Sequence, residues 1–501
     1  MKNKYLIITV IVAVFTFNSC NKWLDVIPRS EIRESVLLST EDGYKYALNG
    51  VYILLADADL YGKNMTMYFP EVLCRHWAMA ASSDSDDEKV RIANFDYANS
   101  DVEGLIAKIW IKYYNAIAQL NSILENLEST DIPFTYNCDK LTRGEILGLR
   151  AFLHLDVLRY FGPVPAEADA TKNTIPYVSE FTTDPNKLIS IPYSKVLEDI
   201  ENDLNEAEQA LEADPVRIYS NSSLRNPSFT ADDLSPDKWM HYRQVRFNYF
   251  AVLATKARFY HWIGEKAQAV EYAKKVIEAV DADNIPKYTL ADEYSFSNTT
   301  EKNGALSMIC EQIFGLHNSD LQNVVISLFA SNPSSLTQTE ALLDKAFEKG
   351  THPFDVRYGN NNRYWQTKTY DYISRITHFR KYTGNDEIAT LNYVPLIRLA
   401  EMYFIVIENI APSEALPYFR TFRTARGMSA FIDEESTGNE TAVLNRLEME
   451  YRKDFFGEGQ MFFFYKRHGY ARFTWPAFYE LPSQDVYMIP KPKTQLAFEL
   501  E

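Results

Sequence analysis

The chain has 501 residues, of which 46% are hydrophobic and 14% aromatic, and this composition excludes an intrinsically disordered protein. Its formal net charge is -17 at pH 7, which argues against binding to nucleic acid or to anionic lipid surfaces. The length suits one large domain or about two to three ordinary ones.

The N-terminal residues have the order of a secretory signal. A short basic stretch precedes an apolar run over residues 5–17, and Ser19 then precedes Cys20. The apolar run is shorter than the about 20 residues that span a bilayer. Residues 17–20, FNSC, resemble a bacterial lipobox, in which the cysteine is lipidated and becomes the new N-terminus. An ordinary secretion signal followed by a chance cysteine is the alternative.

Hydrophobic periodicity divides the chain into five parts. Residues 1–19 are predicted as a lipoprotein signal peptide, and residues 20–40, which are polar, as the lipidated tether. Helical periodicity then marks residues 41–290 as the first part of a helical repeat core. Residues 291–390 lose this period and predict a loop-rich ligand-binding lobe. Residues 391–501 return to the helical core, so the predicted fold class is all-α with an inserted lobe.

Two segments indicate a repeat within this helical core. Residues 245–280 predict two helices that meet at Gly264, with the large and small residues typical of a tetratricopeptide repeat. A related pattern recurs over residues 394–427. The other predicted helices cover residues 41–55, 105–127, 145–161, 193–211 and 440–456.

Signatures of catalysis are scarce in this sequence. No two of the eight histidines stand four residues apart, and neither an HExxH nor a GxSxG motif occurs. A pair of carboxylates suited to glycoside hydrolysis is expected by chance among 68 acidic residues, so a surface glycoside hydrolase stays open. No cofactor is predicted beyond calcium, which Asp84 and Asp86 could coordinate; a solvated acidic loop is the alternative.

Aromatic residues in polar segments are the stronger functional signal. Sugars stack their C–H faces on rings, and their hydroxyl groups need polar partners nearby. The candidate glycan contacts are Asn361, Arg363, Tyr364 and Trp365 in the predicted lobe, and Tyr61, Arg75 and Trp77 before the acidic run. For each tryptophan, packing in the core is the alternative.

Several segments resemble the SusD/RagB family of outer-membrane nutrient-uptake lipoproteins of Bacteroidetes. They are WLDVIP at 23–28, LRAF at 149–152, LRYFGPVP at 158–165, RLAEMY at 398–403, FRTARG at 422–427, EYRKDFFGEGQMFFFYKR at 450–467 and YMIP at 487–490. Asp454 departs from the pattern, because glutamate is common at this position of the family.

The resemblance implies four tetratricopeptide-like helical pairs, a variable lobe and no catalysis. It also implies a lipid-anchored position on the outer membrane, facing the cell exterior. The implied partner is a SusC-like TonB-dependent β-barrel transporter, and the implied ligand is an oligosaccharide or polysaccharide. The family motifs are structural, so the resemblance assigns no glycan-binding residue. A member of the same fold that binds peptides or proteins remains an alternative function.

Overall fold

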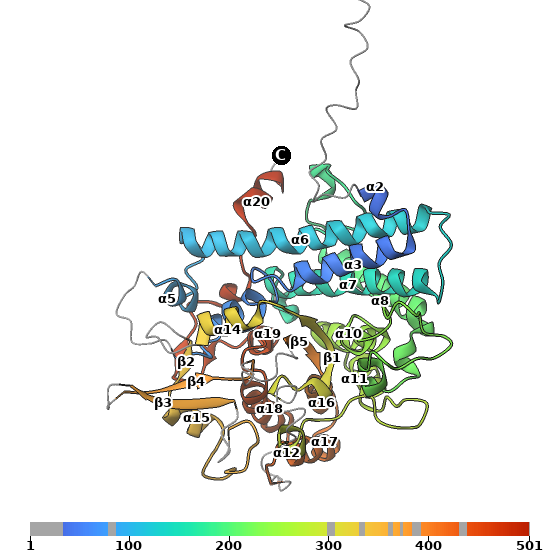
Figure 1. Cartoon of the computed structure of the whole chain (residues 1–501). Helices are drawn as coiled ribbons and strands as arrows, with labels where there is room; N and C mark the ends of the chain where they lie inside the picture. The colour runs from blue at the N-terminus through green and yellow to red at the C-terminus, as the bar shows by residue number, and fades with distance from the viewer. Residues whose placement is uncertain are drawn as a thin grey trace, which may run out of the picture.

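The computed structural model describes residues 34–78, 87–297, 306–329, 336–358, 364–370, 374–382, 392–429 and 438–499. The described chain is mainly helical, which confirms the predicted fold class (Figure 1). Five predicted functional residues lie outside the described residues, namely Cys20, Asp84, Asp86, Asn361 and Arg363.

The long helices of the N-terminal half lie side by side in the upper part of Figure 1. They are α3 (Glu41–Leu55), α6 (Ser100–Ser129), α7 (Cys138–Phe161) and α8 (Tyr193–Ala210), with α2 (Glu34–Leu37) beside them. Side chains start two of them, since the Thr40 hydroxyl accepts from the Gly43 N–H at 3.1 Å and Asn99 caps α6. Helix α7 is buried on nearly all sides, as its apolar sequence predicts.

The later helices complete a series of packed pairs. Helix α3 packs with α6, α7 with α8, α10 (Tyr249–Ile263) with α11 (Lys266–Ile277), and α16 (Leu399–Asn409) with α17 (Pro412–Ala425). Gly264 joins α10 and α11 with a φ of +83°, a conformation that glycine adopts without strain. Helices α18 (Glu440–Asp454) and α19 (Gln460–Arg467) follow. The predicted tetratricopeptide-like arrangement is therefore confirmed.

The remaining helices are short. The α-helices are α4 (Phe69–Leu73), α5 (Glu88–Ala93), α9 (Asn221–Arg225), α12 (Glu293–Ser297), α14 (Leu321–Phe329), α15 (Glu340–Ala346) and α20 (Lys493–Glu499). The π-helix is η2 (Asn64–Tyr68), and the 3₁₀ helices are η3 (Pro165–Glu167), η4 (Pro185–Lys187), η5 (Leu211–Ala213), η6 (Pro215–Arg217), η7 (Arg243–Val245), η8 (Ile309–Glu311) and η10 (Gln484–Tyr487).

Within the described residues, seven short strands form three antiparallel sheets. Strand β1 (Gln312–His317) pairs with β5 (Tyr393–Arg398). Strands β2 (Thr337–Gln338), β4 (Ser374–Phe379) and β3 (Trp365–Tyr370) form the second sheet in that order, and β6 (Arg472–Phe473) pairs with β7 (Tyr479–Glu480). The helix expected from residue 394 therefore begins only at residue 399.

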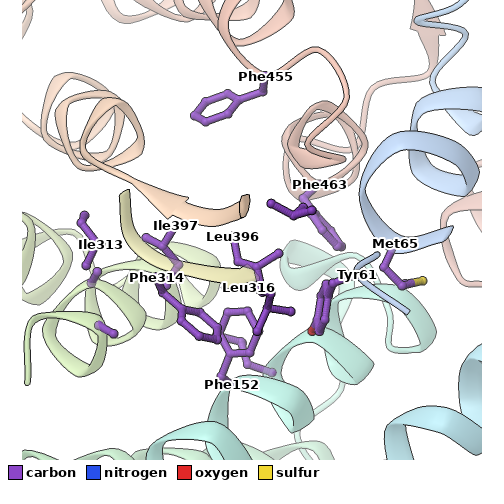
Figure 2. Close-up of a cluster of buried hydrophobic side chains, with 14 of the residues drawn as sticks. Tyr61, Met65, Phe152, Ile313, Phe314, Leu316, Leu396, Ile397, Phe455 and Phe463 are labelled. Carbon is purple, nitrogen blue, oxygen red and sulfur yellow. The ribbon is translucent and has the colours of Figure 1, made fainter. Parts of the chain in front are cut away.

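The β1–β5 pair belongs to the central core of the molecule. Figure 2 shows Phe314 and Leu316 of β1 beside Leu396 of β5, above Phe152 of α7. The rings of Phe152 and Phe314 meet edge to face, with centroids 5.3 Å apart. Residues 291–390 are thus more than loops, and β1 ties this stretch to the C-terminal part across the boundary predicted at residue 390.

A cluster of buried charges holds the C-terminal helices together. The Asp454 carboxylate lies 3.0 Å from Arg357, 2.8 Å from Arg398 and 2.8 Å from Arg426. Burial alone would raise the pKa of Asp454, but the three guanidinium groups hold it well below its usual range. Segments 398–403, 422–427 and 450–467 supply most of this cluster. These family-like segments therefore stabilise the fold.

Candidate functional site

The two predicted tryptophan platforms lie in the core. Trp365 is 0% exposed and Trp77 is 1% exposed, and their ring centroids are 6.1 Å apart. Phe379 and Phe456 pack against both rings. This corrects the expectation of exposed loop rings, because neither indole presents a face to a sugar. The cause is strand pairing, since Trp365 opens β3 and lies opposite Phe379 of β4.

The two predicted tyrosine contacts are also core residues. Tyr61 is buried among the side chains of Figure 2, and its hydroxyl donates to Asp156 at 2.7 Å. Tyr364 is buried next to the ring of Phe379, with centroids 6.4 Å apart. Burial raises the pKa of both phenols well above the usual value. Their placement therefore also corrects the predicted role in an open ligand site.

Arg75 is half-buried, and its guanidinium contacts neighbouring groups of the protein. Its Nη2 donates to the carbonyl oxygen of Ala93 and to Oδ1 of Asn94, both at 2.9 Å. Its guanidinium carbon lies 3.5 Å from the ring centre of Tyr479. Arg75 thus connects the end of α5 to β7, and these contacts are structural.

An open groove with the expected mixture of side chains lies elsewhere in the molecule. It has a volume of about 400 Å³ and runs between α3, the loop at residues 238–246 and the adjacent ends of β1 and β5. We call it the aromatic groove. Its lining residues are Asn49, Tyr52, Ile53, Lys238, Trp239, His241, Tyr242, Val245, Arg246, Gly315, His317 and Tyr393.

Arg246 organises the inner wall of the aromatic groove. Its guanidinium carbon lies 4.5 Å from the ring centre of Tyr52 and 5.4 Å from that of Trp239. The same group donates to Oδ1 of Asn49 at 2.9 Å and to Oε2 of Glu145 at 3.1 Å. The buried Glu145 also accepts from the Tyr52 hydroxyl at 2.6 Å, so this wall is rigidly connected to α7.

The outer rim of the aromatic groove presents rings to solvent. The Tyr242 side chain is 43% exposed, and His317 is exposed as well. His317 meets the half-buried ring of Tyr393 edge to face, with centroids 5.4 Å apart and planes at 73°. These rings can stack on the C–H face of a bound molecule while nearby donors engage its polar groups.

The loop that carries the rim is conformationally strained. Lys238 has a φ of 65° and Tyr242 a φ of 61°, and this left-handed region costs a residue with a side chain about 1–2 kcal/mol. Within the described part of the chain, the buried indole N–H of Trp239 and Nδ1 of His241 have no hydrogen-bond partner. Strain and unpaired polar groups of this kind gather at functional sites.

Sequence reasoning overlooked this loop, although a signal was present. Residues 235–246, SPDKWMHYRQVR, combine rings with cationic donors as residues 360–366 do. In the structure, Lys238 and Tyr242 of the first segment are exposed, whereas Tyr364 and Trp365 of the second are buried.

The chemistry available in the aromatic groove is that of binding. None of its lining residues is an aspartate or a glutamate, so it has no carboxylate pair for glycoside hydrolysis. Across the described residues, no cluster of three or more His, Cys, Asp or Glu side chains could hold a metal ion. Among the described residues, no helix is long and apolar enough to span a membrane.

Two family models match most of the chain. Residues 22–228 match a model described as starch-binding and associating with the outer membrane. Residues 254–497 match the model of the SusD family. The loop at residues 238–246, which builds one side of the aromatic groove, falls between the two matched ranges.

Individual relatives agree with these matches. A SusD-like protein of Formosa agariphila is 27% identical over 164 residues, which is 33% of this chain and 30% of that protein. The match thus spans less than a third of that relative. A SusD superfamily structure from Bacteroides thetaiotaomicron superposes with a TM-score of 0.67 at 18% identity, covering 91% of this chain and 98% of the other. A SusD-like carbohydrate-binding protein of Bacteroides vulgatus gives 0.64 at 17%, covering 92% and 97%.

Proposed function

The chain belongs to the SusD/RagB family, and we propose that it is a non-enzymatic, cell-surface glycan-binding lipoprotein. In this proposal it captures an oligosaccharide or polysaccharide and delivers it to a SusC-like TonB-dependent transporter in the outer membrane. Cys20 carries the lipid that anchors the chain, and the protein faces the cell exterior.

The aromatic groove is the observation that carries the binding role. It joins exposed rings to fixed donors, which is the combination that sugar recognition needs. Its inner wall is held by Glu145 and Asn49, so little ordering is left for the ligand to impose. The absence of acidic lining residues supports capture over hydrolysis at this groove.

A glycan array tests the proposal with the mature full-length chain and its Tyr242→Ala variant. We expect the chain to bind at least one glycan class without shortening it, and Tyr242→Ala to weaken that binding about tenfold, as expected for loss of one stacking ring. Tyr136→Ala is the matched control, because Tyr136 is 38% exposed, has a φ of 53° and does not line the groove. Equal binding by all three proteins would refute the assigned groove, and release of shortened sugars would favour the hydrolase.

The anchor and the partner need a separate experiment in cells. We expect a Cys20→Ala variant to lose incorporation of labelled fatty acid and to leave the membrane fraction. Affinity purification of the lipidated chain from outer membranes should recover a β-barrel transporter. Recovery of the anchored chain without such a barrel would contradict the delivery step and leave glycan capture standing.

A further inference from the structure

We infer that the aromatic groove selects acidic glycans, whose carboxylate or sulfate groups pair with Lys238 at its rim and with donors of Arg246. The inference rests on the proposed function, because it names the ligand class of the same groove. It follows from the charges that line and surround the groove.

The lining of the groove carries cationic or neutral groups only. Lys238 is exposed and forms no ion pair within the described residues. The acid beside it in sequence, Asp237, is directed elsewhere. Its carboxylate pairs with Lys45 and accepts from the Ser235 hydroxyl at 2.6 Å and from the Trp239 N–H at 2.9 Å. Lys238 thus keeps its charge available to a ligand.

The buried charges behind the groove cancel one another. Glu145 lies 3.0 Å from Arg246 and 2.5 Å from Arg243, and Arg243 lies 2.6 Å from Asp214. Two guanidinium groups therefore face two carboxylates. Because this set is neutral, it does not cancel the positive charge of Lys238.

A second cation adds to the field near the β5 end of the groove. Burial raises the pKa of Tyr393, the neighbouring Tyr242 raises it further, and the positive charge of Arg225 opposes this rise. Arg225 is half-buried and has no ion pair within the described part of the chain. Arg225 thus lies close enough to affect Tyr393, and Lys238 lines the same groove.

The positive charge of the groove lining is opposite in sign to the net charge of the whole chain. The formal net charge of -17 repels anions on average, so an acidic sugar is attracted only where a cation without an ion pair is present. In the groove, the ring of Tyr242 offers a stacking face on the same loop as Lys238. Residues 238–246 lie between the two matched family ranges, so this selectivity belongs to the chain's own loop.

The test compares charged and neutral forms of one sugar backbone by calorimetry. The probes are tetragalacturonate, its fully methyl-esterified form, and a sulfated carrageenan tetrasaccharide, which separate a carboxylate source of negative charge from a sulfate source. We expect tetragalacturonate or the sulfated probe to bind at least about tenfold more tightly than the ester. We expect this preference to shrink as NaCl rises from about 0.05 M to about 0.5 M, because added salt screens exposed charges.

Two variants locate the selectivity on the loop. Lys238→Gln should weaken binding of the acidic probe about three- to tenfold and leave the ester unchanged, because only a charge is removed. Lys172→Gln is the matched control, since Lys172 is exposed and does not line the groove. Circular dichroism and the melting temperature establish that both variants are folded.

The outcomes separate this inference from the proposed function. A groove that binds the ester or another neutral glycan as tightly as the acidic probes, in a manner that depends on Tyr242, overturns the acidic selectivity and keeps glycan capture. Equal loss of acidic and neutral binding in Lys238→Gln also overturns it. If neither the probes nor the array show binding that Tyr242→Ala weakens, both ideas fail.

Discussion

The charge cluster around Asp454 and the aromatic groove beside Tyr242 both contain arginines and aromatic rings, but the groove has no acidic lining residue. In the cluster, Arg357, Arg398 and Arg426 are fully buried and each contacts Asp454. In the groove, Lys238 and Tyr242 stand open on a strained loop.

The two regions differ in whether their polar groups remain available to a ligand. Buried charges in the cluster satisfy one another, so they hold helices together and offer nothing to a ligand. In the described chain, the groove keeps Lys238 without an ion pair and presents the Tyr242 ring to solvent. Three segments that resemble the family, 398–403, 422–427 and 450–467, supply most of the cluster, and the groove loop lies between the matched ranges. The segments that carry the family resemblance and the groove proposed to bind the ligand therefore lie in different parts of this chain.

The largest effect should come from removing the centre of the charge cluster. Asp454→Ala leaves three buried guanidinium groups with one carboxylate fewer, and we expect the free energy of unfolding to fall by about 3–5 kcal/mol. Urea denaturation measures this loss. Asp232→Ala is the control, because Asp232 is exposed, and it should change stability by less than about 0.5 kcal/mol. A similar small change for Asp454→Ala would show that the cluster is dispensable.

A comparable loss of stability is expected on substitution of Trp365, which the sequence predicted as a stacking surface for a sugar. Trp365→Ala removes a fully buried ring, and large-to-small changes of this type cost about 3–5 kcal/mol. We expect a lower melting temperature and unchanged glycan affinity in the folded protein. A stable variant with weakened glycan binding would return Trp365 to the binding site, contrary to its position in the structure.

Acid should destabilise the core around α7 through His154. Burial lowers the pKa of this histidine to about 3; its Nε2 accepts from the Val178 N–H at 3.0 Å, and its Nδ1 lies 2.9 Å from the Arg150 carbonyl oxygen. The unfolded state takes up this proton near the ordinary pKa of about 6.5, before the folded state does. Stability contributed by neutral His154 is therefore present above pH 6.5 and is lost as the pH falls toward 3, at up to about 1.4 kcal/mol per pH unit.

Urea denaturation at several pH values measures the slope, with His154→Gln as the comparison. The glutamine cannot take up this proton, so its free energy of unfolding should fall less steeply below pH 6.5. Parallel curves for the two proteins would rule out His154 as the source of the acid sensitivity.

The smallest effect should come from the strained rim of the groove. Tyr242→Gly removes a side chain from a residue with a φ of 61°, and glycine adopts this conformation without the usual cost. We expect stability to rise by up to about 1 kcal/mol while glycan affinity falls about tenfold. Calorimetry and thermal melting of the same sample check both. A loss of stability would indicate that the Tyr242 ring supports the fold.

Local sequence patterns predicted the helices well and the strands poorly. Helix α3 occupies residues 41–55 as predicted, and Gly264 does separate two helices, because the 3.6-residue period and the glycine are local signals. Strand β5 was missed because a short apolar run before a helix has no period of its own. Its partner β1 lies far away in sequence.

The site residues show the same limit more sharply. Trp365 has polar neighbours in sequence, and this predicted an open ring, but pairing between β3 and β4 turns the indole into the core. The aromatic groove joins residues near 50, 240, 317 and 393, which no local pattern relates. Exposure is a property of packing, so composition alone cannot assign it.

By itself, the sequence determined the family, the helical class, the charge and the candidate signal with Cys20, because each depends on local order or on composition. Only the tertiary structure decided which rings are buried and which stand open. In the folded chain, Trp77 and Trp365 are buried in the core, whereas Tyr242 and Lys238 line a groove. The physical reason is that burial depends on which distant segments cover a side chain, and those segments come together only when the chain folds.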